Sequence, residues 1–276
     1  MREQFDLDLV SLDRFTCLFY GAFNVGKTHL LGDFLLWARD RGQQIAYVNI
    51  TGEDGYASLA SMGLGAVGET VSSLDDYDEV MRDYATRKVG ALAVDSLPAL
   101  YRLVMRALMP GHEIRYPDPK LDGDRSKMLW GQLQMKTFGR VLMARDPAPY
   151  VLWVSPYDRS EDPIQGGGGG KGLTPDLPGR LAYGCGGWFD FIGYMSADTI
   201  SATQVRRQVT LAPSGGMLTR QRIPRQITRP LDLSAPRGGW ATIFNAIEQE
   251  FLAVRAVSPA ASSAVPRAVN PHQLGA

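Results

Sequence analysis

Short apolar runs alternate with helical patterns along the first 155 residues of the chain. The runs are bounded by turn or charged residues, which predicts buried strands at 15–20, 44–50, 91–94 and 150–155. Between them, apolar residues recur every three or four positions and predict helices. We expect a helix that ends near Arg41, a helix over 75–87, and a helix over 126–145 with an apolar face of Met128, Met135, Phe138 and Leu142. This alternation predicts an α/β fold with a mostly parallel central sheet and helices on both faces.

The pattern changes after residue 155. A polar stretch at 158–180 contains the run GGGGGKG and predicts a long loop of the functional or mobile kind. Three later segments, WFDFIGYMS, QVRRQVTLA and GMLTRQRI, predict strands that extend the sheet in antiparallel fashion. A last helix is expected around 243–251, before a tail rich in Ala, Ser and Pro. We therefore expect a lead-in over 1–14, which either joins subunits or simply approaches the first strand, one domain over 15–255, and a disordered tail over 256–276.

The stretch YGAFNVGKTHL joins the first predicted strand to the first predicted helix. Gly21, Gly26, Lys27 and Thr28 have the spacing of a phosphate-binding loop, in which glycines let backbone N–H groups turn toward phosphate oxygens. Lys27 can reach the β- and γ-phosphates, and the Thr28 hydroxyl can bind Mg²⁺. The alternative is a Gly-rich turn with an exposed lysine. We expect ATP to bind at Gly21, Ala22, Phe23, Asn24, Val25, Gly26, Lys27, Thr28 and His29, although the His29 side chain itself is expected to be a helix residue rather than a ligand.

Acidic residues follow two of the predicted strands. Asp95 ends the strand at 91–94, where its carboxylate can hold Mg²⁺ together with Thr28; the alternative role for Asp95 and Ser96 is a helix N-cap. Glu53 and Asp54 follow the strand at 44–50, so they belong to the same edge of the sheet as Gly21. We expect Glu53 to activate the water that attacks ATP, and the alternative for either acid is a solvated loop position.

These pieces, in this order, resemble the RecA-like recombinase core. The resemblance covers residues 12 to 225 and rests on the segments FTCLFYGAFNVGKT, IAYVNITGEDG, ALAVDSLPAL, YVLWVSPYDR and PDLPGRLAYGCGGWFDFIGYMS. In size the chain is similar to the short phage-type members, compact ATPases that act in single-strand annealing or recombination. The resemblance implies a RecA-like P-loop NTPase core that binds single-stranded DNA and hydrolyses ATP with Mg²⁺ at the subunit interfaces of a filament or ring.

Further roles are implied by the resemblance alone. The segment 110–127 takes the place of a first DNA loop, whose expected DNA contacts are His112, Arg115, Tyr116, Lys120 and Arg125. The segment 158–172 takes the place of a second DNA loop, with Arg159 and Lys171 as phosphate contacts; the alternative is a slack linker. The segment TRQRIP resembles the one that carries basic fingers into a neighbouring subunit's ATP site, which nominates Arg220 and Arg222. The alternative for the basic residues of this region is a set of solvated strand faces: Arg206, Arg207, Arg220, Arg222, Arg225 and Arg229.

One departure from the family pattern stands at Ser155 and Pro156. Recombinases carry a polar sensor pair at this place, which couples the state of ATP to the second DNA loop. Proline has no N–H to donate, so this coupling cannot use the same donor here.

Charge and composition restrict the function less than the motifs do. The 29 basic and 29 acidic residues balance, so any nucleic-acid role must depend on local patches. Cys17 and Cys185 match no metal-ligand spacing, and no apolar run is long enough for a membrane helix, so we expect a reduced, cytoplasmic protein (host cytoplasm if phage-encoded) without a membrane partner. Expected partners are single-stranded DNA, further copies of the chain and a single-strand-binding protein. Two alternatives remain: a phage motor, helicase-loader or packaging accessory ATPase, and a non-catalytic nucleotide-binding assembly protein.

Overall fold

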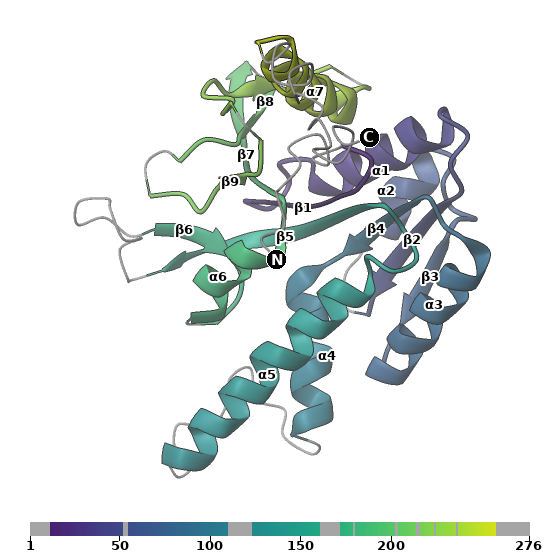
Figure 1. Cartoon of the computed structure of the whole chain (residues 1–276), viewed down its shortest axis with the longest axis vertical. Helices are drawn as coiled ribbons and strands as arrows, with labels where there is room; N and C mark the ends of the chain where they lie inside the picture. Colours follow the sequence, from purple (N-terminus) through teal and green to yellow (C-terminus); the bar gives the residue numbers. More distant parts are fainter. Residues whose placement is uncertain are drawn as a thin grey trace, which may run out of the picture.

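Strands and helices alternate along the described part of the chain (Figure 1). The structure is a computed structural model that describes residues 12–51, 55–109, 123–160, 172–178, 180–201, 204–213, 216–223, 225–235 and 237–257. Its strands are β1 (Phe15–Gly21), β2 (Ile45–Ile50), β3 (Gly68–Val71), β4 (Ala91–Asp95), β5 (Tyr150–Ser160), β6 (Gly172–Pro175), β7 (Phe191–Ser201), β8 (Gln204–Thr210), β9 (Arg220–Gln221) and β10 (Leu231–Asp232). Its helices are α1 (Lys27–Arg39), α2 (Tyr56–Ser61), α3 (Leu74–Arg87), α4 (Leu97–Leu108), α5 (Gly123–Met143), α6 (Arg180–Gly184), the 3₁₀ turn η2 (Cys185–Trp188) and α7 (Gly239–Val257).

The central sheet has the order β10-β8-β7-β1-β5-β4-β2-β3. Every neighbouring pair from β7 to β3 is parallel, whereas β8 runs antiparallel to β7 and β10 antiparallel to β8. The predicted parallel sheet with an antiparallel extension is therefore confirmed. The last predicted strand is shorter than expected, because its pairing with β7 is limited to the two residues of β9. The loop predicted over 158–180 is wrong at both ends, since β5 extends to Ser160 and β6 occupies 172–175. Strands β3 and β10 were not predicted.

Helices cover both faces of the sheet, as predicted. Alternate residues of β1 point to opposite sides: Phe19 packs in one apolar core with residues of α1 and α7, and Leu18 packs in the other with residues of α3, α4 and α5. Burial on both sides explains why the strands consist of nearly unbroken apolar runs. No described helix combines the length and the apolar character needed to cross a membrane.

The apolar face predicted for α5 is wrong for three of its four residues, and only the fourth, Phe138, packs against the core. Met128, Met135 and Leu142 are 61%, 75% and 36% exposed, and the buried face instead carries Leu133 and Thr137. Because Thr137 is polar, the periodicity of apolar residues does not identify this face as the buried one. The Thr137 hydroxyl donates to the carbonyl oxygen of Leu133 at 2.8 Å, which satisfies it inside the helix and allows its burial.

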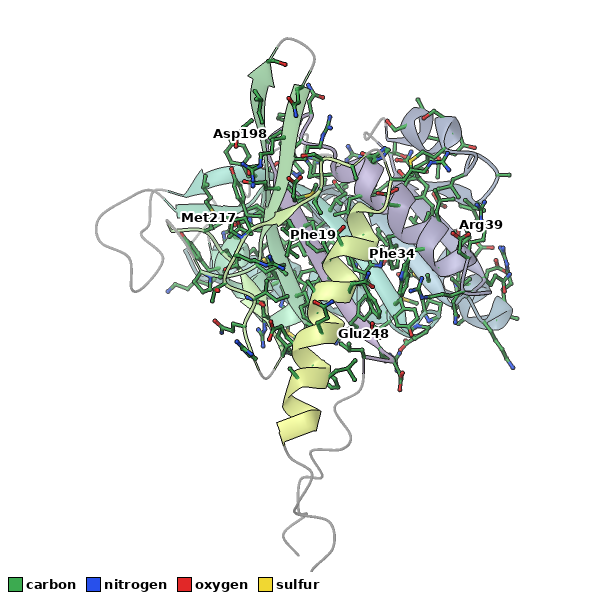
Figure 2. The ribbon with its side chains drawn as sticks, turned by 90° about the horizontal axis from the view of Figure 1, so that it is seen from above. Phe19, Phe34, Arg39, Asp198, Met217 and Glu248 are labelled. Atoms are coloured by element: carbon green, nitrogen blue, oxygen red, sulfur yellow. The ribbon has the colours of Figure 1, made fainter. Side chains whose placement is uncertain are left out.

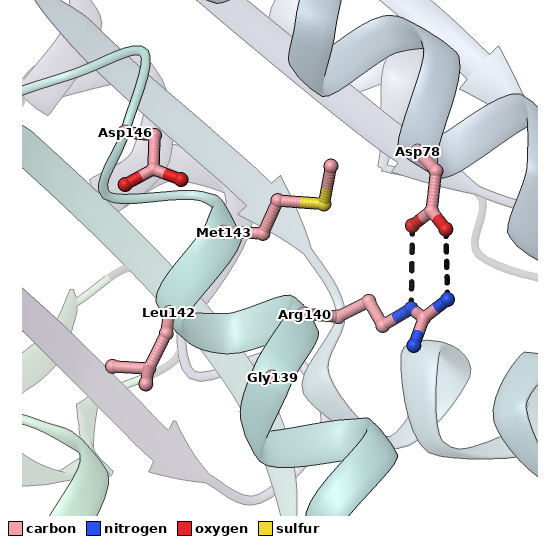
Figure 3. Close-up of a pocket in the computed structure, with 6 residues that line it drawn as sticks. All are labelled: Asp78, Gly139, Arg140, Leu142, Met143 and Asp146. Carbon is pink, nitrogen blue, oxygen red and sulfur yellow. Dashed lines mark hydrogen bonds and ion pairs between the residues drawn. The ribbon is translucent and has the colours of Figure 1, made fainter.

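A surface hollow of about 440 Å³ lies between α3 and α5 (Figure 3). At its side, the Arg140 guanidinium donates to both carboxylate oxygens of Asp78, at 3.2 and 2.7 Å. The Tyr77 hydroxyl also donates to the Arg140 carbonyl at 3.1 Å. Two of the charged residues that line this hollow, Arg140 and Asp78, are thus paired with each other, and the pair holds α5 against α3.

The first turn of α3 supports a prediction about pH. The Asp76 carboxylate accepts from the Ser72 hydroxyl at 2.8 Å and from the Ser72 and Ser73 N–H groups at 3.0 Å each, and these bonds, the Ser72 hydroxyl first, lower the pKa of Asp76 to about 2. A depressed pKa contributes stability that is present above the unfolded-state value of about 3.9 and is lost as the pH falls toward the folded value. Asp76→Asn is therefore expected to lower the thermal midpoint above pH 4 and to match the wild type near pH 2. A difference that stays constant over this range would contradict the assignment.

Candidate functional site

The predicted phosphate-binding loop follows the carboxyl end of β1 and leads directly into α1. Two of its residues have positive φ angles, Asn24 at 63° and Gly26 at 96°. Asparagine tolerates the left-handed region better than most residues and glycine enters it without steric cost, so the local sequence matches the backbone that the loop requires. Because the first N–H groups of a helix have no partner within it, the amino end of α1 offers donors to an anion held in this loop.

The Lys27 side chain folds back over the loop. Its ammonium group donates to the carbonyl oxygens of Gly21 at 3.0 Å and Ala22 at 2.7 Å, and it lies 5.8 Å from the centroid of the Phe23 ring. A positive charge is therefore held at the loop, next to the amino end of α1. This is the position from which a lysine can bind a phosphate group.

Gly21 has a steric role where β1 meets the loop. A Cβ atom at this position would collide with the carbonyl oxygen of Met195, on the neighbouring strand β7. The close approach of two backbones explains why glycine ends β1.

Thr28 and Asp95 meet at the same edge of the sheet, as predicted. The Thr28 hydroxyl donates to Oδ2 of Asp95 at 3.5 Å, and Asp95 is 5% exposed at the end of β4. A hydroxyl and a carboxylate side by side form an oxygen donor set of the type that Mg²⁺ prefers. Both residues therefore fit the metal role that the sequence predicts for them.

The alternative role of Asp95 and Ser96 as a helix cap applies to only one of them. Ser96 is the N-cap of α4, and its hydroxyl accepts from the Ala99 N–H at 3.4 Å. Asp95 precedes the cap and its side chain faces the cavity with Thr28. Ser96 therefore caps α4, whereas Asp95 lines the cavity.

A cavity of about 520 Å³ encloses these groups, a volume within the range of small-molecule sites. Asn24, Lys27 and Thr28 line it from the loop and α1, Asp95 from β4, and Val154 and Pro156 from β5. The remaining described residues of its wall are Phe23, Gly26, His29, Gly55, Ser58 and Ser61.

Ser155 and Pro156 link this cavity to β6. Pro156 lines the cavity, while the Asp176 N–H, just beyond β6, donates to the Ser155 hydroxyl at 3.2 Å and to the Pro156 carbonyl at 3.0 Å. The Tyr20 hydroxyl, one residue before Gly21, donates to the Leu173 carbonyl on β6 at 3.0 Å. Although Pro156 lacks an N–H, hydrogen bonds therefore connect both β5 and β1 to the strand that follows residues 161–171.

Arg220 and Arg222 lie away from the chain's own cavity. Strand β9 pairs with Phe191 and Ile192 at the start of β7, and these residues are level with Cys17 and Leu18, in the first half of β1. The Arg222 guanidinium donates to Asp190 at 2.9 Å, and Arg220 donates to the Gly186 carbonyl. Contact with bound ATP would therefore require the cavity of a second subunit.

Several predicted residues lie outside the described part of the chain. These are Glu53 in 52–54, the residues His112, Arg115, Tyr116 and Lys120 in 110–122, and Lys171 in 161–171. Arg125 belongs to α5 and Arg159 to β5. The catalytic role of Glu53 and the DNA contacts of the other residues stay predictions.

The sequence reasoning missed the wall of the cavity formed around α2. A Cβ atom on Gly55 would lie 2.5 Å from the Asp95 carboxylate and 3.0 Å from Thr28, so glycine leaves room beside the proposed metal ligands. Ser58 and Ser61 line the cavity from α2 itself. A helix of six residues carries too few turns to show a helical period, and the only usable signal was its position directly after Glu53 and Asp54.

Comparison with known proteins gives a distant structural likeness. No family model matches the chain, and no curated protein matches it. Among solved structures, a KaiC-like protein from the hyperthermophilic archaeon Pyrococcus horikoshii is similar, with a TM-score of 0.47 and 13% sequence identity over 79% of this chain and 84% of that one. A likeness this distant assigns neither a family nor a function to the chain.

Proposed function

We propose that this chain is an ATPase of the RecA-like type that binds single-stranded DNA and promotes annealing or strand exchange as a filament or ring. The observation that carries the ATPase part is the convergence of Lys27, Thr28 and Asp95 in one cavity at the carboxyl edge of a parallel sheet. A cation held on the phosphate loop next to an oxygen donor pair suits a triphosphate and its metal ion.

Each residue of the proposed site has a defined task. Lys27 binds the β- and γ-phosphates, and Thr28 and Asp95 hold Mg²⁺, which neutralises charge on the phosphate oxygens when bound. Glu53 orients a water molecule and takes its proton as the water oxygen bonds to the γ-phosphorus. The bond from that phosphorus to the bridging oxygen breaks, and ADP and phosphate leave.

The position of Arg220 and Arg222 supports assembly of a specific kind. The cavity and these arginines lie on different parts of one subunit, so a head-to-tail interface could bring the arginines of one copy to the cavity of the next. An interface that joins two different surfaces repeats into a ring or a filament. An arginine that arrives in this way would stabilise charge on the transferring phosphoryl group.

The DNA part of the proposal depends on the predicted loops and on the links from the cavity to β6. Hydrogen bonds join Tyr20 to Leu173 on β6, and Ser155 and Pro156 to Asp176 just after β6, and β6 borders the segment that resembles a second DNA loop. A change at the nucleotide therefore has a short path of direct contacts to that loop.

The decisive experiment measures ATP hydrolysis by the full chain with Mg²⁺, with and without a poly-dT oligonucleotide, at low salt. We expect the oligonucleotide to stimulate hydrolysis and to be retained by the protein, with retention falling steeply as salt rises. Annealing of complementary strands should accompany hydrolysis.

Other outcomes separate the alternatives. Hydrolysis without stimulation or retention would exclude the recombination function and leave the nucleotide site intact. Stimulated hydrolysis without annealing would favour the motor or loader function. The non-catalytic assembly protein would be favoured by two results together: the wild type does not hydrolyse ATP, and Glu53→Gln retains DNA as well as the wild type does.

A further inference from the structure

The antiparallel hairpin of β7 and β8 extends the sheet beside the phosphate loop. Gly21, the last residue of β1, pairs with Met195, but β7 continues for six further residues to Ser201 and β8 returns alongside it. Figure 2 shows these two strands projecting from the body of the molecule, with Asp198 on one of them. Side chains on β8 can thus reach the phosphate loop from within the same chain.

Two successive arginines on β8 point to opposite faces of the hairpin. Arg206 pairs across the strands with Asp198 and forms an ion pair with Asp232 at 3.7 Å. Arg207, which pairs across the strands with Ala197, faces the other way. Its side chain contacts Gly26, where a Cβ atom would lie 3.2 Å from Nε and 3.3 Å from Cδ of the arginine.

The backbone of Arg207 is held in place. Its N–H donates to the Ser234 hydroxyl at 2.9 Å, and its carbonyl accepts from the Leu233 N–H at 2.8 Å. The anchored backbone and the contact with Gly26 together direct the side chain toward the loop. This arrangement reduces the conformational entropy that the arginine would lose on binding a ligand.

The charges around Arg207 are unbalanced. Within the part of the chain that the structure describes, its guanidinium forms no hydrogen bond or ion pair. The adjacent charged features are Lys27, which follows Gly26 directly, and the positive end of the α1 dipole. A second fixed cation at this place is unfavourable by itself and becomes favourable when an anion binds the loop.

We propose that Arg207 is a nucleotide-binding residue that contacts the diphosphate of a nucleotide held in its own chain's phosphate loop. This inference rests on the proposed nucleotide site. Arg207 approaches the loop from the β7 and β8 side of β1, whereas Asp95 and Thr28 meet on the β4 side. A metal ion held by Thr28 and Asp95 would neutralise charge at the terminal phosphate on the β4 side, which would leave Arg207, on the β7 side, to contact the phosphates that ADP and ATP share.

The test compares Arg207→Ala with Arg206→Ala, a matched control that removes the same side chain from the opposite face of the hairpin. Binding of ADP and of ATP with Mg²⁺ is measured by calorimetry on the full chain. Arg207→Ala is expected to raise both dissociation constants by about 10- to 100-fold and by the same factor, the loss typical of a hydrogen bond to a charged group. Arg206→Ala should stay within about twofold of the wild type, as expected for a surface substitution.

Three results would overturn the inference: Arg207→Ala binding both nucleotides like the wild type, Arg206→Ala losing as much affinity, or a loss confined to ATP. Unfolding midpoints measured without nucleotide should be the same for Arg207→Ala and the wild type, which excludes a loss of folding. Arg207→Lys, which keeps the positive charge, should recover part of the nucleotide affinity. Failure of the proposed nucleotide site would give a different result. Either the wild type would bind neither ADP nor ATP, or Lys27→Ala would bind both nucleotides as tightly as the wild type does.

Discussion

Replacement of Lys27 by alanine is expected to lower ATP hydrolysis by about 10²- to 10³-fold, the usual loss when one fixed donor to a transition-state charge is removed. Lys27 is held over the phosphate loop by the Gly21 and Ala22 carbonyl oxygens, at 3.0 and 2.7 Å, and it lines the same cavity as Asp95. Alanine retains the helix and the loop glycines but leaves the phosphate oxygens without this cation. Steady-state release of phosphate with saturating Mg²⁺ measures the effect.

Lys136→Ala is the control for this substitution. Lys136 is exposed on α5, outside the set of residues that line the cavity, so turnover should remain within about twofold of the wild type. Unfolding midpoints without nucleotide should be similar for the two variants. Turnover at the wild-type level in Lys27→Ala would show that the cavity is not the site of hydrolysis.

Replacement of Trp240 by alanine is expected to destabilise the fold by about 3–5 kcal/mol, as is typical when a large buried aromatic is removed. Trp240 is fully buried in α7, and its ring centroid lies 5.0 Å from that of Phe34 on α1 and 5.7 Å from that of Phe15 on β1. It therefore joins α7 to the helix that begins at Lys27. Urea unfolding followed by circular dichroism measures the loss.

Trp240→Phe distinguishes packing from hydrogen bonding. Among the described residues, the buried Nε1 atom of Trp240 has no hydrogen-bond partner, so phenylalanine removes ring volume without breaking a bond. Most of the stability should therefore be retained in Trp240→Phe. Equal losses in the two variants, or a loss below about 1 kcal/mol in Trp240→Ala, would contradict the packing role, since about 1 kcal/mol is the average for any substitution.

The residues of the candidate site that could be predicted from the sequence, the phosphate loop and Asp95, belong to short continuous segments. The loop from Gly21 to Thr28 follows a buried strand and opens a helix, so its shape depends mainly on its own glycines. Asp95 was predictable because the carboxyl ends of parallel strands meet at one edge, whichever strand supplies the residue. Strands β1, β2, β4 and β5 were predictable because each contains an apolar run, whereas β3, with the sequence GETV, was not predicted.

The rest depends on pairing between distant segments. Arg207 faces the loop only because Gly21 pairs with Met195 and Ala197 with Arg207, and a shift of one residue would turn Arg206 inward instead. The buried face of α5 was missed because Thr137 satisfies its hydroxyl within the helix, which periodicity cannot detect. Neither register nor internal hydrogen bonding can be read from residue spacing.

The length of β5 has a mechanical consequence. The strand pairs with β4 up to Val154, with β1 up to Pro156 and with β6 from Tyr157 to Ser160, so one continuous backbone joins the central sheet to β6. Pro156, the last residue of β5 that pairs with β1, also lines the cavity, so a movement of the cavity wall would tilt the end of β5. Because a strand rises about 3.3 Å per residue, a tilt of about 10° at Pro156 would displace the backbone at Ser160 by about 2 Å. Small movements around a bound phosphate would thus be enlarged at the far end of β5.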